Sequence, residues 1–342
     1  MAPVGSYEAL AAAIQAGADS VYFGVGKLNM RSASAANFTL DDLAKIVDTN
    51  DEWIRTRTGI RERRISSGEG TRHLAAKAAE RALAAAGVAP EELDIIILGT
   101  SSPDRNYPSD ACSVQAAIGA VNAVAFDISA ACAGFIFAMN IVEGFFKAGI
   151  YKTALIIGAE TLSKVTDWND RGTCVLFGDG AGAAVVTAAE ETGIIDMMMG
   201  ADGTKGDVLA CTSRTVGNFL TGTKPELGFM TMDGQEVFIF AVWKVPESVM
   251  ELLQRTGTKK EDIKYYVLHQ ANERIIEAAA RRLKEPMEKF PMTIGQFGNT
   301  STASIPLLLD DMIQKDMLKR GDKIIMSGFG AGMTWGAVLM EW

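Results

Sequence analysis

The chain has 342 residues, of which 48% are hydrophobic and 22% charged, and its formal net charge is −9. This composition is typical of a folded globular protein and excludes a chain that is disordered throughout, while the negative charge argues against non-specific binding to nucleic acids. No apolar run approaches the roughly 20 residues that span a membrane, so we expect neither a membrane segment nor a signal peptide.

Short apolar runs alternate along the chain with alanine-rich amphipathic runs. The apolar runs predict strands buried on both faces, at residues 94–99, 123–128, 153–158, 174–177, 183–187, 265–268 and 323–327. The amphipathic runs predict helices, at residues 71–86, 133–147, 237–256, 273–283 and 305–317. The alternation indicates an α/β protein whose sheets are covered by helices.

Two pairs of similar segments suggest an internal duplication. Gly87–Ser102 (GVAPEELDIIILGTSS) and Gly257–Asn272 (GTKKEDIKYYVLHQAN) align without gaps, and their separation is about half the chain. Phe177–Val186 and Phe329–Leu339 also share a glycine-rich pattern. These matches predict two duplicated halves that meet near Glu190–Gly193. Two unrelated α/β units with similar loops are the alternative.

The cysteines and histidines are few and do not form a metal-binding pattern. The chain has two histidines and four cysteines, none of them in a C-x-x-C pair. A structural zinc site is therefore not expected, and a chain of this size needs no disulfide framework. We expect a cytoplasmic protein without a metal or a bound cofactor.

Cys132 lies in AFDISAACAGFIFAMNI, where a predicted strand passes through small residues into a predicted helix. A thiol near a helix N-terminus is favoured as a thiolate, which is the nucleophilic form. The small neighbours would let a substrate approach closely. The alternative is a buried inert cysteine, which is the usual role of a free cysteine.

His269 and Asn299 also lie at the ends of predicted elements. His269 ends the strand at 265–268, where a structural histidine is the alternative, and Asn299 lies in FGNTSTASIP, where it would serve as a helix cap. With Cys132 they supply a thiol, an imidazole and an amide, which is the set that a cysteine-dependent acyltransferase needs. Whether the three lie together depends on the fold.

The glycine-rich stretches at 177–182 and 328–332 match neither the P-loop nor the dinucleotide-binding pattern, so we reject a nucleotide site of those types. Tight turns near a reacting group are favoured, and the backbone N–H of Ala331 could donate to an oxyanion. Arg274, Arg281 and Arg282 share one face of the helix at 273–283. They form either a local cationic patch or an ordinary solvated face.

From Leu43 to Trp342 the sequence resembles the β-ketoacyl-acyl-carrier-protein synthase III family of thiolase-fold condensing enzymes. The motifs that carry the resemblance are DTNDEWIRTRTGIRERRI, AFDISAACAGF, DRGTCVLFGDGAGAAVV, VLHQANERII, FGNTSTASIP and GFGAGMTWGAV. The resemblance implies a five-layer αβαβα sandwich of two duplicated halves. The halves would be residues 44–190, with the nucleophile, and residues 191–342, with the histidine and the asparagine.

The resemblance also implies a reaction. Cys132 would take an acyl group from acetyl-CoA or another short acyl-CoA, and malonyl-acyl-carrier protein would then be decarboxylated and condensed with it. His269 and Asn299 would stabilise the enolate, and the N–H groups of Cys132 and Ala331 would hold the oxyanion. CoA is thus a substrate, and fatty-acid synthesis would be initiated.

The resemblance assigns further residues and a homodimeric state. Trp53 and Arg171 would sandwich the CoA adenine, with Arg57 nearby. Tyr107 would cross the dimer interface to close the partner's acyl pocket, beside which Phe329 lies. The remaining assignment is the docking patch for acidic acyl-carrier protein, which would be formed by Arg274, Arg281 and Arg282.

The N-terminus departs from this family. Residues 2–43 instead resemble the opening of bacterial collagenase-like peptidases, which include an AGADSVYFG step. This segment amounts to one βα unit, far short of a barrel of about 250 residues, so a peptidase site is not expected. Its strand Ser20–Val25 could replace the family's first strand, and the helix Tyr7–Ala16 would be additional. A chimera of two families is therefore predicted.

A second departure lies in the docking region. Ile239 and Trp243 stand where the family often has basic residues, and exposed apolar side chains there would weaken carrier-protein binding or signal another partner surface. The leading interpretation is a condensing enzyme. The alternatives are a related acyl-CoA-dependent acyltransferase of the thiolase fold and an inactive or merely CoA-binding fusion.

Overall fold

The computed structural model describes residues 43–189 and 193–342. The predicted helix Tyr7–Ala16, the predicted strand Ser20–Val25 and the predicted boundary at residue 190 lie outside the described residues. Among the helices of the described part, none is long and apolar enough to cross a membrane.

The first of two four-stranded sheets has the order β2-β1-β3-β4. Its strands are β1 (Ile95–Gly99), β2 (Val124–Ile128), β3 (Thr153–Glu160) and β4 (Gly180–Thr187). Strands β2, β1 and β3 are parallel, whereas β4 runs antiparallel to β3. Among the described strands, β2 is therefore an edge of the sheet, and it ends just before Cys132.

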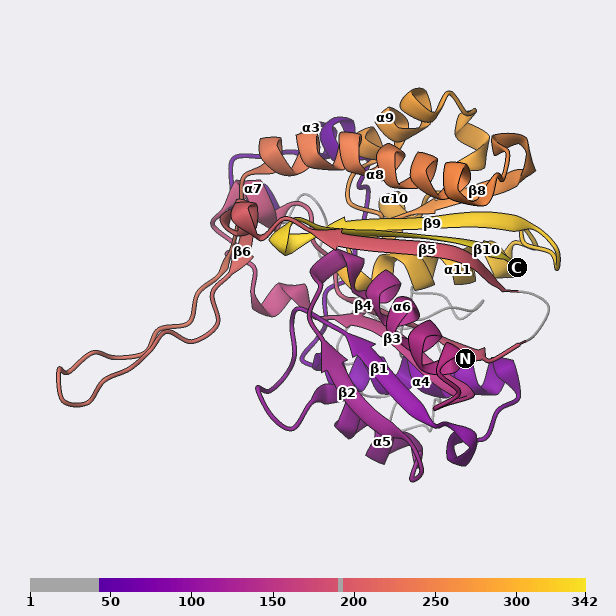
Figure 1. The fold of residues 1–342 in the computed structure, drawn as a ribbon. Coiled ribbons are helices and arrows are strands. Elements are labelled where there is room, and N and C mark those ends of the chain that lie inside the picture. The colour runs from indigo at the N-terminus through magenta and orange to yellow at the C-terminus, as the bar shows by residue number, and fades with distance from the viewer. Residues whose placement is uncertain (1–42, 190–192) are drawn as a thin grey trace, which may run out of the picture.

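The second sheet has the order β5-β10-β9-β8. Its strands are β5 (Ile194–Ala201), β8 (Ile263–Leu268), β9 (Lys323–Gly330) and β10 (Thr334–Glu341). A separate ribbon pairs β6 (Leu209–Cys211) with β7 (Met230–Met232). Between these two short strands, residues 212–229 form an arm that extends away from the body (Figure 1).

Helices cover both faces of each sheet and so produce five layers (Figure 1). The outer helices are α4 (Thr71–Ala86) and α5 (Asp110–Ile118) on one side and α8 (Gly234–Thr256) and α9 (Glu273–Leu283) on the other. Helices α6 (Gly134–Lys147) and α11 (Ser304–Gln314) form the middle layer. The predicted αβαβα sandwich is confirmed.

The side-chain alternation of the strands explains the layers. In β1, Ile95 and Ile97 pack against α6 and α11 in the central core, and Ile96 and Leu98 pack against α4 and α5 on the opposite face. Successive side chains of a strand point to opposite faces. A strand that is covered on both faces must therefore be apolar at every position.

The expected strand at 174–177 is not observed. A short helix, α7 (Arg171–Cys174), occupies its first residue, and Asp170 caps this helix by accepting from the Gly172 N–H at 2.8 Å. A capping aspartate favours helix over strand at this position. The remaining short helices are α3 (Asp51–Thr58) and α10 (Ile294–Phe297).

The two sheets repeat with the alignment found in the sequence. When residue 87 is aligned with residue 257, strand β3 matches β9 at both ends, and the start of α6 matches the start of α11. The short 3-10 turns that precede these helices, Ala131–Ala133 and Ser301–Ala303, match in the same way. The duplication is therefore visible in the fold as well as in the sequence.

Candidate active site

Cys132 lies in the 3-10 turn that leads into α6, and the second half of the chain holds this turn in place. Ala131 has a left-handed φ of 45°. Its carbonyl accepts from Thr302 Oγ1 at 2.7 Å, and the carbonyl of Ala130 accepts from Thr334 Oγ1 at 3.1 Å. These bonds stabilise a turn that is costly for a residue with a Cβ.

The Cys132 thiol is buried, and burial raises its pKa to about 12. The negative charge of Glu160 raises this pKa further, whereas the Ser301 hydroxyl and the backbone N–H of Cys132 lower it. Burial therefore acts on this pKa in the direction opposite to the one expected for a thiol near a helix N-terminus.

His269 follows the last residue of β8 and is also buried. Burial lowers its pKa to about 3, so the imidazole is neutral at physiological pH. Its Nδ1 lies 2.6 Å from the hydroxyl oxygen of Ser304, and its ring meets the edge of Phe329 with centroids 5.3 Å apart. Two neighbours therefore fix the orientation of the ring.

Asn299 presents its amide nitrogen to the same pocket. Its Oδ1 accepts from the Ser301 N–H at 2.9 Å, and Nδ2 has no hydrogen-bond partner within residues 43–189 and 193–342. Its backbone is bonded on both sides to the first half of the chain: Asn299 N–H donates to Leu176, and the Gly178 N–H donates to Asn299. The alternative of a local cap is thus partly correct, because Oδ1 does cap the following turn.

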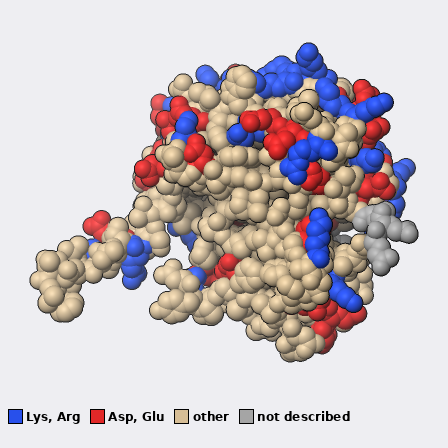
Figure 2. All heavy atoms as spheres, in the orientation of Figure 1, with Lys and Arg blue, Asp and Glu red and all other residues tan. Residues whose placement is uncertain are grey.

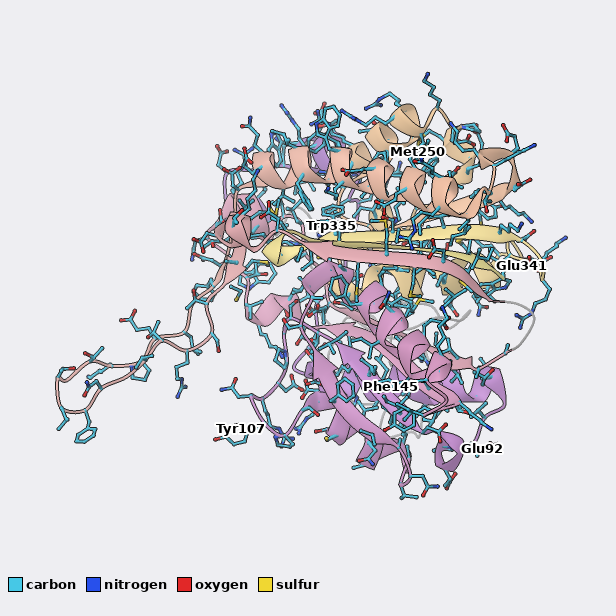
Figure 3. The ribbon with its side chains drawn as sticks, in the orientation of Figure 1. Glu92, Tyr107, Phe145, Met250, Trp335 and Glu341 are labelled. Atoms are coloured by element: carbon cyan, nitrogen blue, oxygen red, sulfur yellow. The ribbon has the colours of Figure 1, made fainter. Side chains whose placement is uncertain are left out.

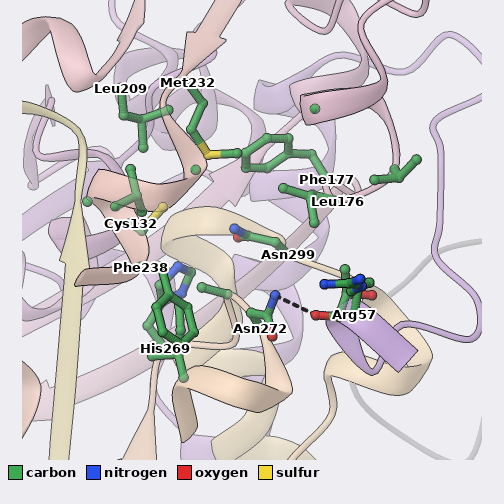
Figure 4. A pocket seen from close by; sticks show the side chains of 18 of the residues that line it. Arg57, Cys132, Leu176, Phe177, Leu209, Met232, Phe238, His269, Asn272 and Asn299 are labelled. Carbon is green, nitrogen blue, oxygen red and sulfur yellow. Dashed lines mark hydrogen bonds between the residues drawn. The ribbon is translucent and has the colours of Figure 1, made fainter. Parts of the chain in front are cut away.

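One pocket of about 230 Å³ is lined by Cys132, His269 and Asn299 together (Figure 4). Figure 4 shows the amide end of Asn299 directed toward the other two side chains. The walls are mainly apolar and are formed by Leu209, Met232, Val237, Phe238 and Phe329. The three groups that the sequence left in separate segments are therefore gathered in one pocket.

The mouth of the pocket contains the residues expected to bind CoA. Trp53, Arg57 and Arg171 all line it. The Arg171 guanidinium lies 4.1 Å from the centroid of the Trp53 ring, so the two side chains stack directly on one another. An aromatic base could lie between them only if Arg171 moved off the indole. The backbone of Arg57 accepts from Asn272 Nδ2 at 3.1 Å.

Ala331 begins the 3-10 turn after β9, next to the turn of Cys132. A Cβ on the preceding Gly330 would lie 2.6 Å from the Cys132 backbone nitrogen, so the two backbones touch only because this residue is glycine. Tyr107, by contrast, is 85% exposed and lies at the periphery of the molecule (Figure 3). It does not line the pocket of its own chain.

The three arginines expected on the docking face lie on α9, and all three are exposed. Basic side chains gather over α8 and α9, with acidic ones among them (Figure 2). Arg282 stacks on the exposed Trp243, with its guanidinium carbon 3.3 Å from the ring centroid. Arg281 pairs with Glu277 at 3.7 Å. As expected, Ile239 and Trp243 are exposed, at 42% and 59%.

Sequence reasoning missed residues that hold the site together. Glu160 is fully buried and accepts hydrogen bonds from side chains of the 100–102 segment and from Thr302 Oγ1 at 3.1 Å. Ser304 contacts His269. Glu160 is the last residue of β3 and Ser304 is the first residue of α11, and nothing in the sequence distinguishes either from an ordinary residue at such a position. No group of three or more potential metal ligands occurs among the described residues.

Comparisons with known proteins agree with this geometry. Residues 126–203 match the family model described as 3-Oxoacyl-[acyl-carrier-protein (ACP)] synthase III, and residues 253–342 match its C-terminal counterpart. Residues 5–54 match Peptidase family U32, which confirms the second resemblance at the N-terminus.

Individual relatives extend over most of the chain. A β-ketoacyl-[acyl-carrier-protein] synthase III of Clostridium novyi is 53% identical over 89% of this chain and 94% of the relative, and that of Clostridium acetobutylicum is 52% identical over the same shares. Among solved structures, the synthase III of Aquifex aeolicus superposes with a TM-score of 0.83 at 47% identity, covering 89% of this chain and 95% of that one.

Proposed function

Because the chain belongs to the 3-oxoacyl-[acyl-carrier-protein] synthase III family, we propose that it condenses a short acyl-CoA with malonyl-acyl-carrier protein and so initiates fatty-acid synthesis. The observation that carries the proposal is the apolar pocket lined together by Cys132, His269 and Asn299. Acetyl-CoA is the first acyl donor proposed for this pocket.

In the first half-reaction the Cys132 sulfur attacks the acyl-CoA carbonyl. A bond forms between Sγ and the acyl carbon, the bond to the CoA sulfur breaks, and the thiol proton leaves on CoA. The oxyanion of this step lies within reach of the backbone N–H groups of Cys132 and Ala331, whose backbones are brought together by Gly330. The backbone donors need no rearrangement during the reaction.

In the second half-reaction the malonyl group loses CO₂, and its electron pair passes to the α-carbon as an enolate. His269 and Asn299 donate hydrogen bonds to the thioester oxygen, which carries the negative charge. The α-carbon then attacks the acyl carbon, the bond to Cys132 breaks, and the departing thiolate takes a proton from water. The product is a 3-ketoacyl-acyl-carrier protein.

The test is the intact mass of the protein after incubation with acetyl-CoA, compared with the variant Cys132→Ala. We expect a gain of one acetyl group in the parent only, followed by loss of that group and formation of acetoacetyl-carrier protein when malonyl-carrier protein is added. No acylation with acetyl-CoA or longer acyl-CoAs would contradict the proposal and favour an inactive fusion. Acylation that supports transfer only to a small-molecule acceptor would favour a related acyltransferase.

Acyl-carrier protein is proposed to dock on α8 and α9. Arg274, Arg281 and Arg282 supply positive charge on an otherwise acidic chain, and acidic partners are attracted to such local patches. Trp243 and Ile239 add an apolar component. Arg282→Ala is expected to raise the KM for malonyl-carrier protein while leaving acylation by acetyl-CoA unchanged. An unchanged KM would place the docking surface elsewhere.

A homodimer is the proposed assembly. Strand β2 is a sheet edge, and Val124 on it is 48% exposed. The arm at 212–229 exposes Val216, Phe219 and Leu220. Unpaired apolar edges are sites of strand pairing with another chain. Sedimentation should give twice the chain mass, and a monomer at micromolar concentration would contradict this.

A cytoplasmic location is also proposed. The four free cysteines fit it, because free thiols are typical of a reducing compartment.

A further inference from the structure

Ser304 is the first residue of α11 and is buried against the end of β8. We propose that Ser304 fixes the tautomer of His269 with the ring proton on Nε2, so that the imidazole faces the pocket as a hydrogen-bond donor and not as a base. The inference rests on the proposed condensation, because it assigns Ser304 a part in the second half-reaction.

The hydrogen bonds of the Ser304 hydroxyl determine which ring nitrogen carries the proton. Among the described residues its Oγ has two hydrogen-bond partners, His269 Nδ1 at 2.6 Å and the backbone N–H of Gln270 at 3.3 Å. A backbone N–H can only donate, so Oγ accepts from Gln270. Of the two partners only Nδ1 can accept, so the hydroxyl hydrogen makes a hydrogen bond within this set only when it points to Nδ1.

An imidazole that accepts at Nδ1 carries its single proton on Nε2 when it is neutral. Burial keeps the ring neutral near physiological pH, because it lowers the pKa of His269 to about 3. The opposite tautomer would direct a second N–H at the Ser304 oxygen and leave the hydroxyl hydrogen without an acceptor among these two partners. The arrangement therefore selects one tautomer.

The ring is also held in place around this bond. The Phe329 ring packs against the imidazole at an interplanar angle of 69°, and the His269 backbone N–H donates to Ser327 at 2.8 Å. A flip of the imidazole would break the bond to Ser304. Ser304 thus acts through His269 as a positioning residue and touches no reacting atom itself.

The proposed tautomer should affect the two half-reactions differently. With protons on His269 Nε2 and Asn299 Nδ2, the pocket presents two donors to one developing oxyanion, which is what decarboxylation requires. The same imidazole has no free lone pair facing the Cys132 thiol. Acylation of Cys132 should then be independent of Ser304, whereas condensation should depend on it.

The experiment compares the parent with Ser304→Ala, Ser304→Thr and the control Ser248→Ala. Ser248 is a buried serine of α8 whose hydroxyl donates to the carbonyl of Val245 at 2.9 Å and lies 3.5 Å from the hydroxyl oxygen of Ser327, so it does not touch the His269 ring nitrogen. Condensation should fall by about tenfold to a hundredfold in Ser304→Ala, the range found when the partner that orients an imidazole is removed. Acylation by acetyl-CoA should stay within about twofold of the parent, and Ser304→Thr should recover condensation.

A spectroscopic readout is available because the chain has only two histidines, His73 and His269. Ring ¹⁵N shifts of histidine-labelled protein report the tautomer, and His73→Gln identifies the second signal. The parent should show His269 protonated on Nε2, and Ser304→Ala should show a tautomer mixture. A parent with the proton on Nδ1, or a tautomer unchanged in Ser304→Ala, would overturn the inference. A parent that never condenses would overturn the proposed function alone, because the tautomer is measured without turnover.

Discussion

The turn that carries Cys132 and its counterpart in the second half have the same backbone but contribute differently to the site. Ala131 and Ser301 both adopt left-handed φ values, 45° and 49°. The next residue is Cys132 in the first turn, where it lines the pocket, and Thr302 in the second, where it is buried. Thr302 Oγ1 instead bonds to Glu160 and to the carbonyl of Ala131.

The residues that pack next to the two turns also differ between the halves: where one half has a side chain, the other has a glycine. In the alignment of the two halves His269 corresponds to Gly99, and Gly330 corresponds to Glu160. A Cβ on Gly99 would lie 2.7 Å from Thr302 Cγ2, and one on Gly330 would lie 2.6 Å from the Cys132 nitrogen. Each glycine therefore stands where an atom of the other half comes too close for a Cβ, and the corresponding position of the other half carries a side chain. Of the two duplicated turns, the one with Cys132 lines the pocket, and the one with Thr302 holds the Cys132 turn in place through hydrogen bonds.

The largest effect is expected from adding a methyl group at Gly330. Gly330→Ala places a Cβ against the backbone N–H of Cys132, which must shift because the neighbouring atoms are backbone. Loss of one oxyanion donor costs about 10²-fold or more, so acylation by acetyl-CoA should fall by that factor. Gly203→Ala, where an added Cβ meets nothing within 4 Å, is the matched control. Equal acylation rates in both variants would refute the close approach.

A smaller effect, on stability, is expected at the counterpart residue Glu160. Glu160→Gln leaves an amide nitrogen facing the hydroxyl and N–H donors of Ser101, Ser102 and Thr302. Breaking this buried charged network should lower the free energy of unfolding in urea by about 2–4 kcal/mol.

The same substitution removes a negative charge that raises the pKa of Cys132. Alkylation of Cys132 by iodoacetamide should therefore become faster at pH 8, after subtraction of the rate in Cys132→Ala. A slower reaction, with stability unchanged, would show that Glu160 does not act on this turn as described.

The smallest effect concerns the middle layer, where Asp310 of α11 corresponds to Asn140 of α6 in the same alignment. Burial raises the pKa of Asp310 to about 6, with Asp311 adding to the shift. Between the ordinary carboxyl pKa and 6 the folded state binds the extra proton, so the free energy of unfolding falls as pH rises through this window.

Asp310→Asn removes that penalty. The gain in stability of the variant over the parent should develop as pH rises from about 4 to about 6, stay constant above 6 and disappear below pH 4. Thermal melts of both proteins at pH 4 and pH 8 measure the difference. A gain that is the same at both pH values would mean that the charge of Asp310 is not responsible.

Local patterns allow much of the fold to be predicted. Helices α4 and α9 begin and end where their amphipathic patterns do, and an unbroken apolar run identifies β1. The patterns miss strands β5 and β10, and β5 mixes exposed and half-buried positions. They also predict a strand at residues 174–177, where the capped helix α7 ends and a turn follows. The burial pattern within one helix or strand can be predicted from its own residues. At residues 171–177, in contrast, the helix forms in place of a strand because the side chain of Asp170 caps it.

Local sequence patterns are enough to predict the duplicated α/β elements, the alignment of the two halves and the types of residue available for chemistry. The packing of the two halves brings Cys132, His269 and Asn299 into one pocket, buries the thiol, and places Ser304 and Glu160 against the site, and no local pattern predicts this. The physical reason is that hydrophobic periodicity depends on neighbouring residues of one element. Desolvation and hydrogen bonds between the halves depend instead on how two sheets and their central helices pack together.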